Sequence, residues 1–183
     1  MPRRTDFREE VPSFLIVCEG KKTEPYYFKA FRVGRVLDVR VEGMGKSTTN
    51  LVQETIRLKA QDDYEQVWVV FDIDDCSPAQ VNDAIRLAEA NEIHTAYSNQ
   101  SFELWYLLHF DYHNSAIDRK QYEDKLTRAL GVRYKKNAPG LYLRLLPYQR
   151  TAIQNAKRLL ANYPKPDPCR DNPCTTVFRL VEE

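Results

Sequence analysis

The sequence lacks the features of a membrane-spanning or secreted protein. No apolar stretch approaches the roughly 20 residues that a membrane-spanning helix needs, and the opening MPRRTDFREE is charged where a secretory signal is apolar. The four cysteines show no CxxC spacing, and the three histidines are not spaced with them as zinc ligands would be. These absences exclude a zinc ribbon and predict a soluble protein of the reducing cytoplasm, without a membrane partner.

Charges of one sign are almost missing from two long segments. Residues 62–118 hold twelve acidic residues and a single basic one, Arg86, whereas residues 119–165 hold twelve basic residues against Glu123 and Asp124. Five tyrosines are interleaved in the basic segment. A basic, tyrosine-rich segment suits the backbone and bases of a nucleic acid, although it could instead be a solvated surface that complements the acidic half of the chain.

The apolar periodicity predicts an α/β fold. Strands are expected at residues 13–18, 36–41, 67–74 and 93–97, with helices between them at 23–33, from about Asn50, and at 78–91. Such an alternation implies right-handed crossovers and a parallel four-stranded sheet with helices on both faces, a Rossmann-like arrangement. In sheets of this kind, functional sites gather at the carboxyl ends of the strands.

A length of 183 residues suits one domain with an appendage. The predicted organisation is a flexible arm at residues 1–12, a metal-binding core at 13–110, and a basic, mainly helical extension at 111–183 packed on that core. Helices are expected at 119–130 and 151–163, and a last one after Asn172-Pro173.

The stretch VWVVFDIDD, residues 67–75, runs from an apolar strand into three carboxylates. Because strand side chains alternate, Asp72 and Asp74 should share one face, roughly 7 Å apart. Two like charges held so close call for a cation, and Mg²⁺, or Mn²⁺ in its place, is commonly held by one or two carboxylates beside a phosphate. Asp75 is a further metal ligand or, alternatively, caps the helix that begins near Ser77; the acids could also simply end the strand.

Two more carboxylates belong to the same prediction. Glu19 follows the first strand, so it should meet Asp72 at one edge of the sheet. Glu103 interrupts the aromatic run SFELWYLLHF, and it either reaches solvent or points into the metal pocket. The aromatic side chains of this run, and His109 with them, are expected in the core. The predicted catalytic set is Glu19, Asp72, Asp74 and Glu103, and the predicted metal ligands are Glu19, Asp72, Asp74 and Asp75.

The segment GKSTTN, residues 45–50, superficially suggests a P-loop. That motif requires an earlier glycine where this chain has Arg40, so a Walker-type ATPase is excluded. Lys46 either contacts a phosphate near the start of the next helix or belongs to a turn capped by Asn50. The predicted nucleic-acid contacts are Lys46, Lys135, Lys136, Arg144 and Arg150.

Four segments in order along the chain, IVCEGKKTEPYYF, VFDIDD, SNQSFELWYLLHF and NPCTTVFRLV, resemble the RloB-like family of Toprim proteins. The resemblance implies a Toprim-like fold, with Glu19 in acid–base chemistry or metal binding and Asp72 and Asp74 holding Mg²⁺. Asn99 and Glu103 fall in the family's own motif, in which Gln100 stands where proline is usual. The resemblance also implies a role in restriction-associated anti-phage defence, beside an ATPase partner encoded nearby.

The residues and the resemblance together predict a Mg²⁺-dependent nuclease or phosphodiesterase acting on DNA or RNA. One alternative is a non-catalytic subunit that binds nucleic acid or an ATPase. Another is a phosphatase of the haloacid dehalogenase type, which also carries DxD at a strand end, but there the acids follow the first core strand, and here that strand ends in Glu19. A topoisomerase or primase would need further domains.

Overall fold

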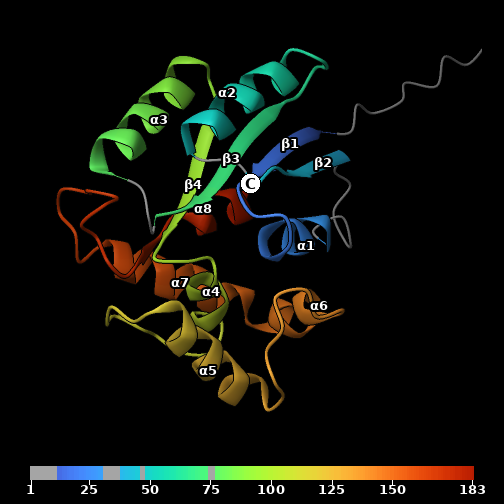
Figure 1. Cartoon of the computed structure of the whole chain (residues 1–183). Helices are drawn as coiled ribbons and strands as arrows, with labels where there is room; N and C mark the ends of the chain where they lie inside the picture. The colour runs from blue at the N-terminus through green and yellow to red at the C-terminus, as the bar shows by residue number, and fades with distance from the viewer. Residues whose placement is uncertain (1–11, 31–37, 46–47, 74–76) are drawn as a thin grey trace, which may run out of the picture.

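The computed structural model describes residues 12–30, 38–45, 48–73 and 77–183 (Figure 1). It is a mixed α/β structure around a five-stranded sheet in the order β2-β1-β3-β4-β5. The strands are β1 (Ser13–Cys18), β2 (Asp38–Gly43), β3 (Gln66–Asp72), β4 (His94–Asn99) and β5 (Cys174–Thr175). The first four strands pair in parallel, and β5 pairs with β4 in the antiparallel direction.

Helices flank both faces of the sheet. The helices are α1 (Thr23–Ala30), α2 (Thr48–Lys59), α3 (Pro78–Ala90), α4 (Glu103–Leu107), α5 (Arg119–Leu130), α6 (Leu141–Leu145), α7 (Gln149–Leu160) and α8 (Val177–Glu182), with a 3-10 turn η1 (Leu146–Tyr148). Figure 1 shows α2 and α3 side by side on one face, and α1 and α8 on the other. Below the sheet in that view, α4 to α7 form a helical layer.

The alternation of strand side chains divides the core in two. On β1, Phe14 and Ile16 pack with the aromatic side chains of α1 and α4, whereas Leu15 and Val17 pack with α2 and α3. The same alternation on β3 sends Trp68 toward the helical layer. Because Asp72 lies four residues after Trp68, the strand period of two directs it to that same side.

The predicted α/β sheet flanked by helices is confirmed, but the prediction that it is four-stranded and wholly parallel is wrong, because a fifth, antiparallel strand joins its edge. The fifth strand, β5, has two residues, and Ser98 and Asn99 of β4 pair with Thr175 and Cys174. So short a strand has no periodicity to detect, and it forms because β4 presents an open edge. It separates Asn172-Pro173 from α8, where a helix was expected to begin directly.

The helical predictions hold to different extents. The predicted helix 119–130 matches α5, which Asp118 and Gln121 cap reciprocally and Gly131 ends at a φ of 67°. The helix predicted at 151–163 corresponds to α7, which begins two residues earlier, at Gln149. The five-residue α6 was not predicted. In the described part of the chain, no helix has the length and apolar character needed to cross a membrane.

Candidate functional site

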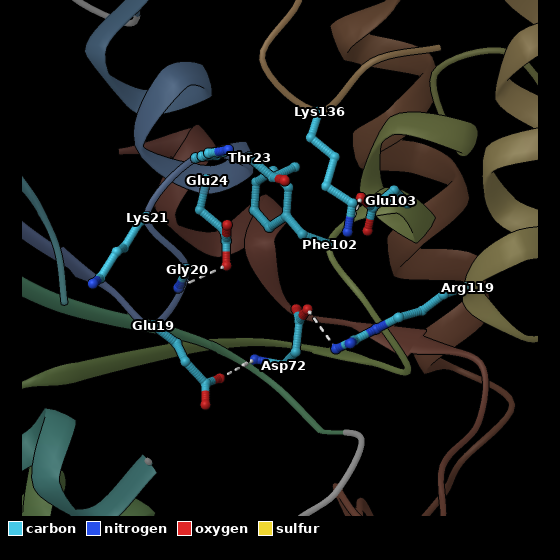
Figure 2. A pocket seen from close by; sticks show the side chains of 11 residues that line it. Glu19, Gly20, Lys21, Thr23, Glu24, Asp72, Phe102, Glu103, Arg119 and Lys136 are labelled. Carbon is cyan, nitrogen blue, oxygen red and sulfur yellow. Dashed lines mark hydrogen bonds and ion pairs between the residues drawn. The ribbon is translucent and has the colours of Figure 1, made fainter. Parts of the chain in front are cut away.

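A cavity of about 400 Å³ opens where β1 and β3 end against the helical layer (Figure 2). We call it the acid cavity, and it is lined by Glu19, Gly20, Lys21, Lys22, Thr23, Glu24, Asp72, Phe102, Glu103, Arg119 and Lys136. Four acidic and four basic residues therefore line this cavity, contributed by the loop after β1, by α1, β3, α4 and α5, and by the loop that precedes α6.

Glu19 joins the ends of the two central strands. Its backbone N–H continues the ladder by donating to the carbonyl of Val70 at 2.8 Å, and its Oε2 accepts the backbone N–H of Asp72 at 3.0 Å. In Figure 2, the Glu19 side chain extends to the opposite side of β3 from Glu24. The predicted meeting of Glu19 and Asp72 at one sheet edge therefore occurs through the Asp72 backbone.

Asp72 is a largely buried acid of the cavity. Its side chain is 16% exposed, its Oδ2 lies 3.7 Å from a terminal nitrogen of Arg119, and its Oδ1 is buried without a hydrogen-bond partner among the described residues. Burial raises the pKa of Asp72 well above its usual value, and the nearby carboxylates of Glu24 and Glu103 raise it further. Arg119 lowers that pKa only in part. The folded chain thus holds an incompletely compensated carboxylate at the end of its central strand.

Glu24 faces Asp72 from the first turn of α1 (Figure 2). Its Oε1 accepts the backbone N–H of Gly20 at 3.2 Å, and a β-carbon at position 20 would collide with this carboxylate. A side chain at position 20 would therefore push the end of the Glu24 side chain away from this loop. Burial raises the pKa of Glu24, while hydrogen bonds from backbone N–H groups oppose the rise.

Glu103 enters the cavity from the first residue of α4 and is 3% exposed. Its Oε1 accepts a hydrogen bond from the Tyr134 hydroxyl at 3.1 Å and lies 3.6 Å from the ammonium of Lys136. Burial, followed by the charge of Glu103, raises the pKa of Tyr134, so this hydroxyl stays a donor. Of the two alternatives left open by the sequence, Glu103 takes the one inside the pocket.

The structure brings together some of the predicted site residues and not others. Glu19, Asp72, Glu103 and Lys136 line the acid cavity. Lys46, Asp74 and Asp75 lie outside the described residues. Lys135 and Arg150 are exposed, and Arg144 donates to the carbonyl of Leu130 at 2.6 Å, near the end of α5. A nucleic-acid contact for these basic residues stays a prediction.

Sequence reasoning missed Glu24 and Arg119. An acid in the first turn of a helix is expected from the helix dipole alone, so Glu24 carried no distinct signal. Arg119 carried one, because a cation as the first residue of α5 opposes that dipole. The ion pair with Asp72 explains why Arg119 stands at this position. This pair, like the pair of Lys136 with Glu103, joins the basic segment to the acidic half of the chain.

His109 lies in the core, as expected. It is 1% exposed, its Nδ1 donates to the Trp105 carbonyl at 2.9 Å, and its ring packs edge-on against Trp105. Burial lowers the pKa of His109 to about 4. The residue is neutral at physiological pH, and its ring forms part of the aromatic core.

The donor chemistry of the acid cavity suits a hard cation. Within the described residues, no three acidic, histidine or cysteine side chains converge closely enough to hold a metal ion by themselves. Mg²⁺ commonly takes only one or two carboxylates and completes its shell with water and phosphate oxygens. The unpartnered Oδ1 of Asp72 is an oxygen of the type that Mg²⁺ takes as a ligand.

A family model described as RloB-like protein matches residues 14–183, nearly the whole chain. No curated protein and no solved structure matches it. The match includes β1, β3 and the loop into α4, and therefore every carboxylate described above. The chain belongs to the RloB-like protein family.

Proposed function

We propose that this chain is a Mg²⁺-dependent phosphodiesterase of Toprim type that cleaves a nucleic acid. The observation that carries the proposal is the Asp72 carboxylate, which lies at the end of the central strand with one oxygen unpartnered and two further acids nearby. A cluster of this kind is costly for the fold unless a cation or a proton resides there. A Mg²⁺ ion bound there would offset that cost and act on a phosphate.

Asp72, with Glu24 or Glu103, would hold the ion. When bound, Mg²⁺ would polarise the scissile phosphate and stabilise the charge on the leaving oxygen. Mn²⁺ suits the same oxygen ligands. Asp74, the second acid of the DxD pattern, and the adjacent Asp75, both outside the described residues, are proposed as additional ligands.

The cationic side chains supply phosphate affinity that the acids cannot. Lys21, Lys22, Arg119 and Lys136 line the same cavity as the carboxylates. In the hydrolysis, a water oxygen gives up a proton and bonds to phosphorus, the bond from phosphorus to the leaving sugar oxygen breaks, and that oxygen takes up a proton. Arg119, 3.7 Å from Asp72, is proposed to orient the phosphate. Glu19, whose carboxylate accepts the Asp72 backbone N–H, is proposed to serve in proton transfer.

The test is a cleavage assay with labelled single-stranded and duplex DNA and RNA in Mg²⁺, in Mn²⁺ and in EDTA. Asp72→Asn keeps the shape of the side chain and removes its charge, so cleavage should fall at least about a hundredfold. Asp83→Asn is the matched control, because Asp83 lies on the surface of α3, paired with Arg86. Cleavage by the Asp72→Asn variant at the wild-type rate would remove the assignment.

A second candidate is a subunit that binds nucleic acid without cutting it. It is favoured by the two cations already near the acids, Arg119 at 3.7 Å from Asp72 and Lys136 at 3.6 Å from Glu103. Salt-sensitive binding with no cleavage of any substrate in saturating Mg²⁺ or Mn²⁺ would select it. For either candidate, the family resemblance supports a role in anti-phage defence beside an ATPase partner.

A further inference from the structure

A second cavity of about 400 Å³ adjoins the acid cavity. Its walls come from α1, α4, α6 and the loop before α6, and they are mainly aromatic and aliphatic. We call it the tyrosine cavity, after Tyr26, Tyr106 and Tyr142, which line it. Lys136 lines both cavities, so the two are neighbours.

The inner wall of the tyrosine cavity is fixed in place. Tyr106 is 2% exposed and its hydroxyl donates to the Thr23 carbonyl at 3.1 Å. Tyr142 packs edge-on against Tyr27, with ring centroids 5.2 Å apart. A wall held by such contacts is largely formed before any ligand arrives.

The outer wall is open to solvent. Tyr26 is 53% exposed and Leu143 is 57% exposed, on the two sides of the cavity that α1 and α6 provide. Large apolar side chains left in solvent beside a preformed hollow are typical of a binding surface. The charged groups among the lining residues are Lys29 and Lys136, both cationic.

We propose that the tyrosine cavity takes one unpaired nucleobase of the strand whose phosphate occupies the acid cavity. This rests on the proposed function and names its substrate class: single-stranded nucleic acid, or an unpaired stretch within a folded one. The aromatic walls provide a stacking surface for a base, and the two lysines suit the phosphates on either side of it. A paired base within a duplex has both faces covered by its neighbours, so it does not enter such a cavity.

The experiment measures binding of short labelled single strands, one RNA and one DNA, by fluorescence anisotropy in EDTA. The loss of one stacking side chain typically weakens binding about tenfold, so Tyr26→Ala should raise the Kd for a single strand by that factor. The Tyr26→Phe variant should bind the single strand with the wild-type Kd, because stacking needs the ring and not the hydroxyl. Tyr148→Ala is the matched control, as Tyr148 is 47% exposed and lies outside the tyrosine cavity. The Kd for a duplex should not respond to Tyr26→Ala.

The outcomes separate this inference from the proposed function. An unchanged Kd for Tyr26→Ala, an equal loss for Tyr148→Ala, or no binding of any single strand overturns the tyrosine cavity as a base site. If Mg²⁺-dependent cleavage persists in the first of these cases, the nuclease stands and only the base site falls. If Tyr26-dependent binding is found without any cleavage, the base site stands and the nuclease falls.

Discussion

Replacing Tyr134 by phenylalanine tests whether the buried carboxylate of Glu103 depends on its hydrogen bond. The Tyr134 side chain is 7% exposed and its hydroxyl donates to Glu103 Oε1 at 3.1 Å. Tyr134→Phe removes one oxygen atom and leaves the ring packing intact. Glu103 Oε1 also lies 3.6 Å from the ammonium of Lys136, whose side chain is 46% exposed.

A hydrogen bond to a charged group contributes about 1.5–3 kcal/mol, because its loss leaves a buried charge without a donor. Tyr134→Phe should therefore lower the free energy of unfolding by about 2 kcal/mol, measured by urea denaturation. For a chain of this length, that corresponds to a fall in Tm of about 4–8 °C. A double-mutant cycle with Glu103→Gln isolates the part that belongs to the pair.

The matched control is Tyr163→Phe. The Tyr163 hydroxyl donates to the Pro173 carbonyl at 3.0 Å, so the same substitution removes a bond of similar length to a neutral acceptor. Its loss should cost about 1 kcal/mol. Equal costs for the two variants, or a coupling energy near zero between Tyr134 and Glu103, would refute the charged character of the bond.

Two further predictions concern titrating groups. In EDTA at about pH 7.5, Asp72→Asn should raise the urea midpoint above that of wild type and of Asp83→Asn, because the raised pKa of Asp72 disfavours its ionised form in the folded state. Since the folded pKa exceeds the unfolded one, the gain should shrink as the pH falls toward about 4, and a lower midpoint at neutral pH would contradict it. For His109 the sign is opposite: its folded pKa of about 4 lies below the unfolded value, so the unfolded state takes up a proton first as the pH falls. Wild type should lose about 1.6 kcal/mol between pH 6.5 and pH 5, and His109→Gln should show a flatter profile.

The buried strands were predictable because their signal is local. Five consecutive apolar residues before Asp72 can be packed in few ways other than as a central strand, and β3 is that strand. The helix α5 was predictable for the same reason, since its cap, apolar stripe and terminal glycine are all close in sequence. The position of the Glu103 side chain was predictable as one of two alternatives, because a carboxylate within an aromatic run either reaches solvent or points into a polar pocket.

The rest of the site depends on contacts between distant residues. Arg119 lies 47 positions after Asp72 in the chain, and no periodicity connects them. Tyr134 reaches Glu103 from a loop whose path is set by the packing of α5 and α6 on α4 and α1. Strand β5 exists only as a complement to β4. Such pairings follow from the assembled fold and leave no mark in a short window of sequence.

The two residues of β5 also cover the edge of the sheet at β4. They and Thr176 occupy the backbone groups of Tyr97, Ser98 and Asn99, with the Thr176 N–H donating to the Tyr97 carbonyl at 2.8 Å. A sheet edge stripped of such a cover is a template for aggregation. A chain truncated before Cys174 should therefore self-associate through β4. An affinity tag fused directly after α8 would lie next to the segment that prevents this association.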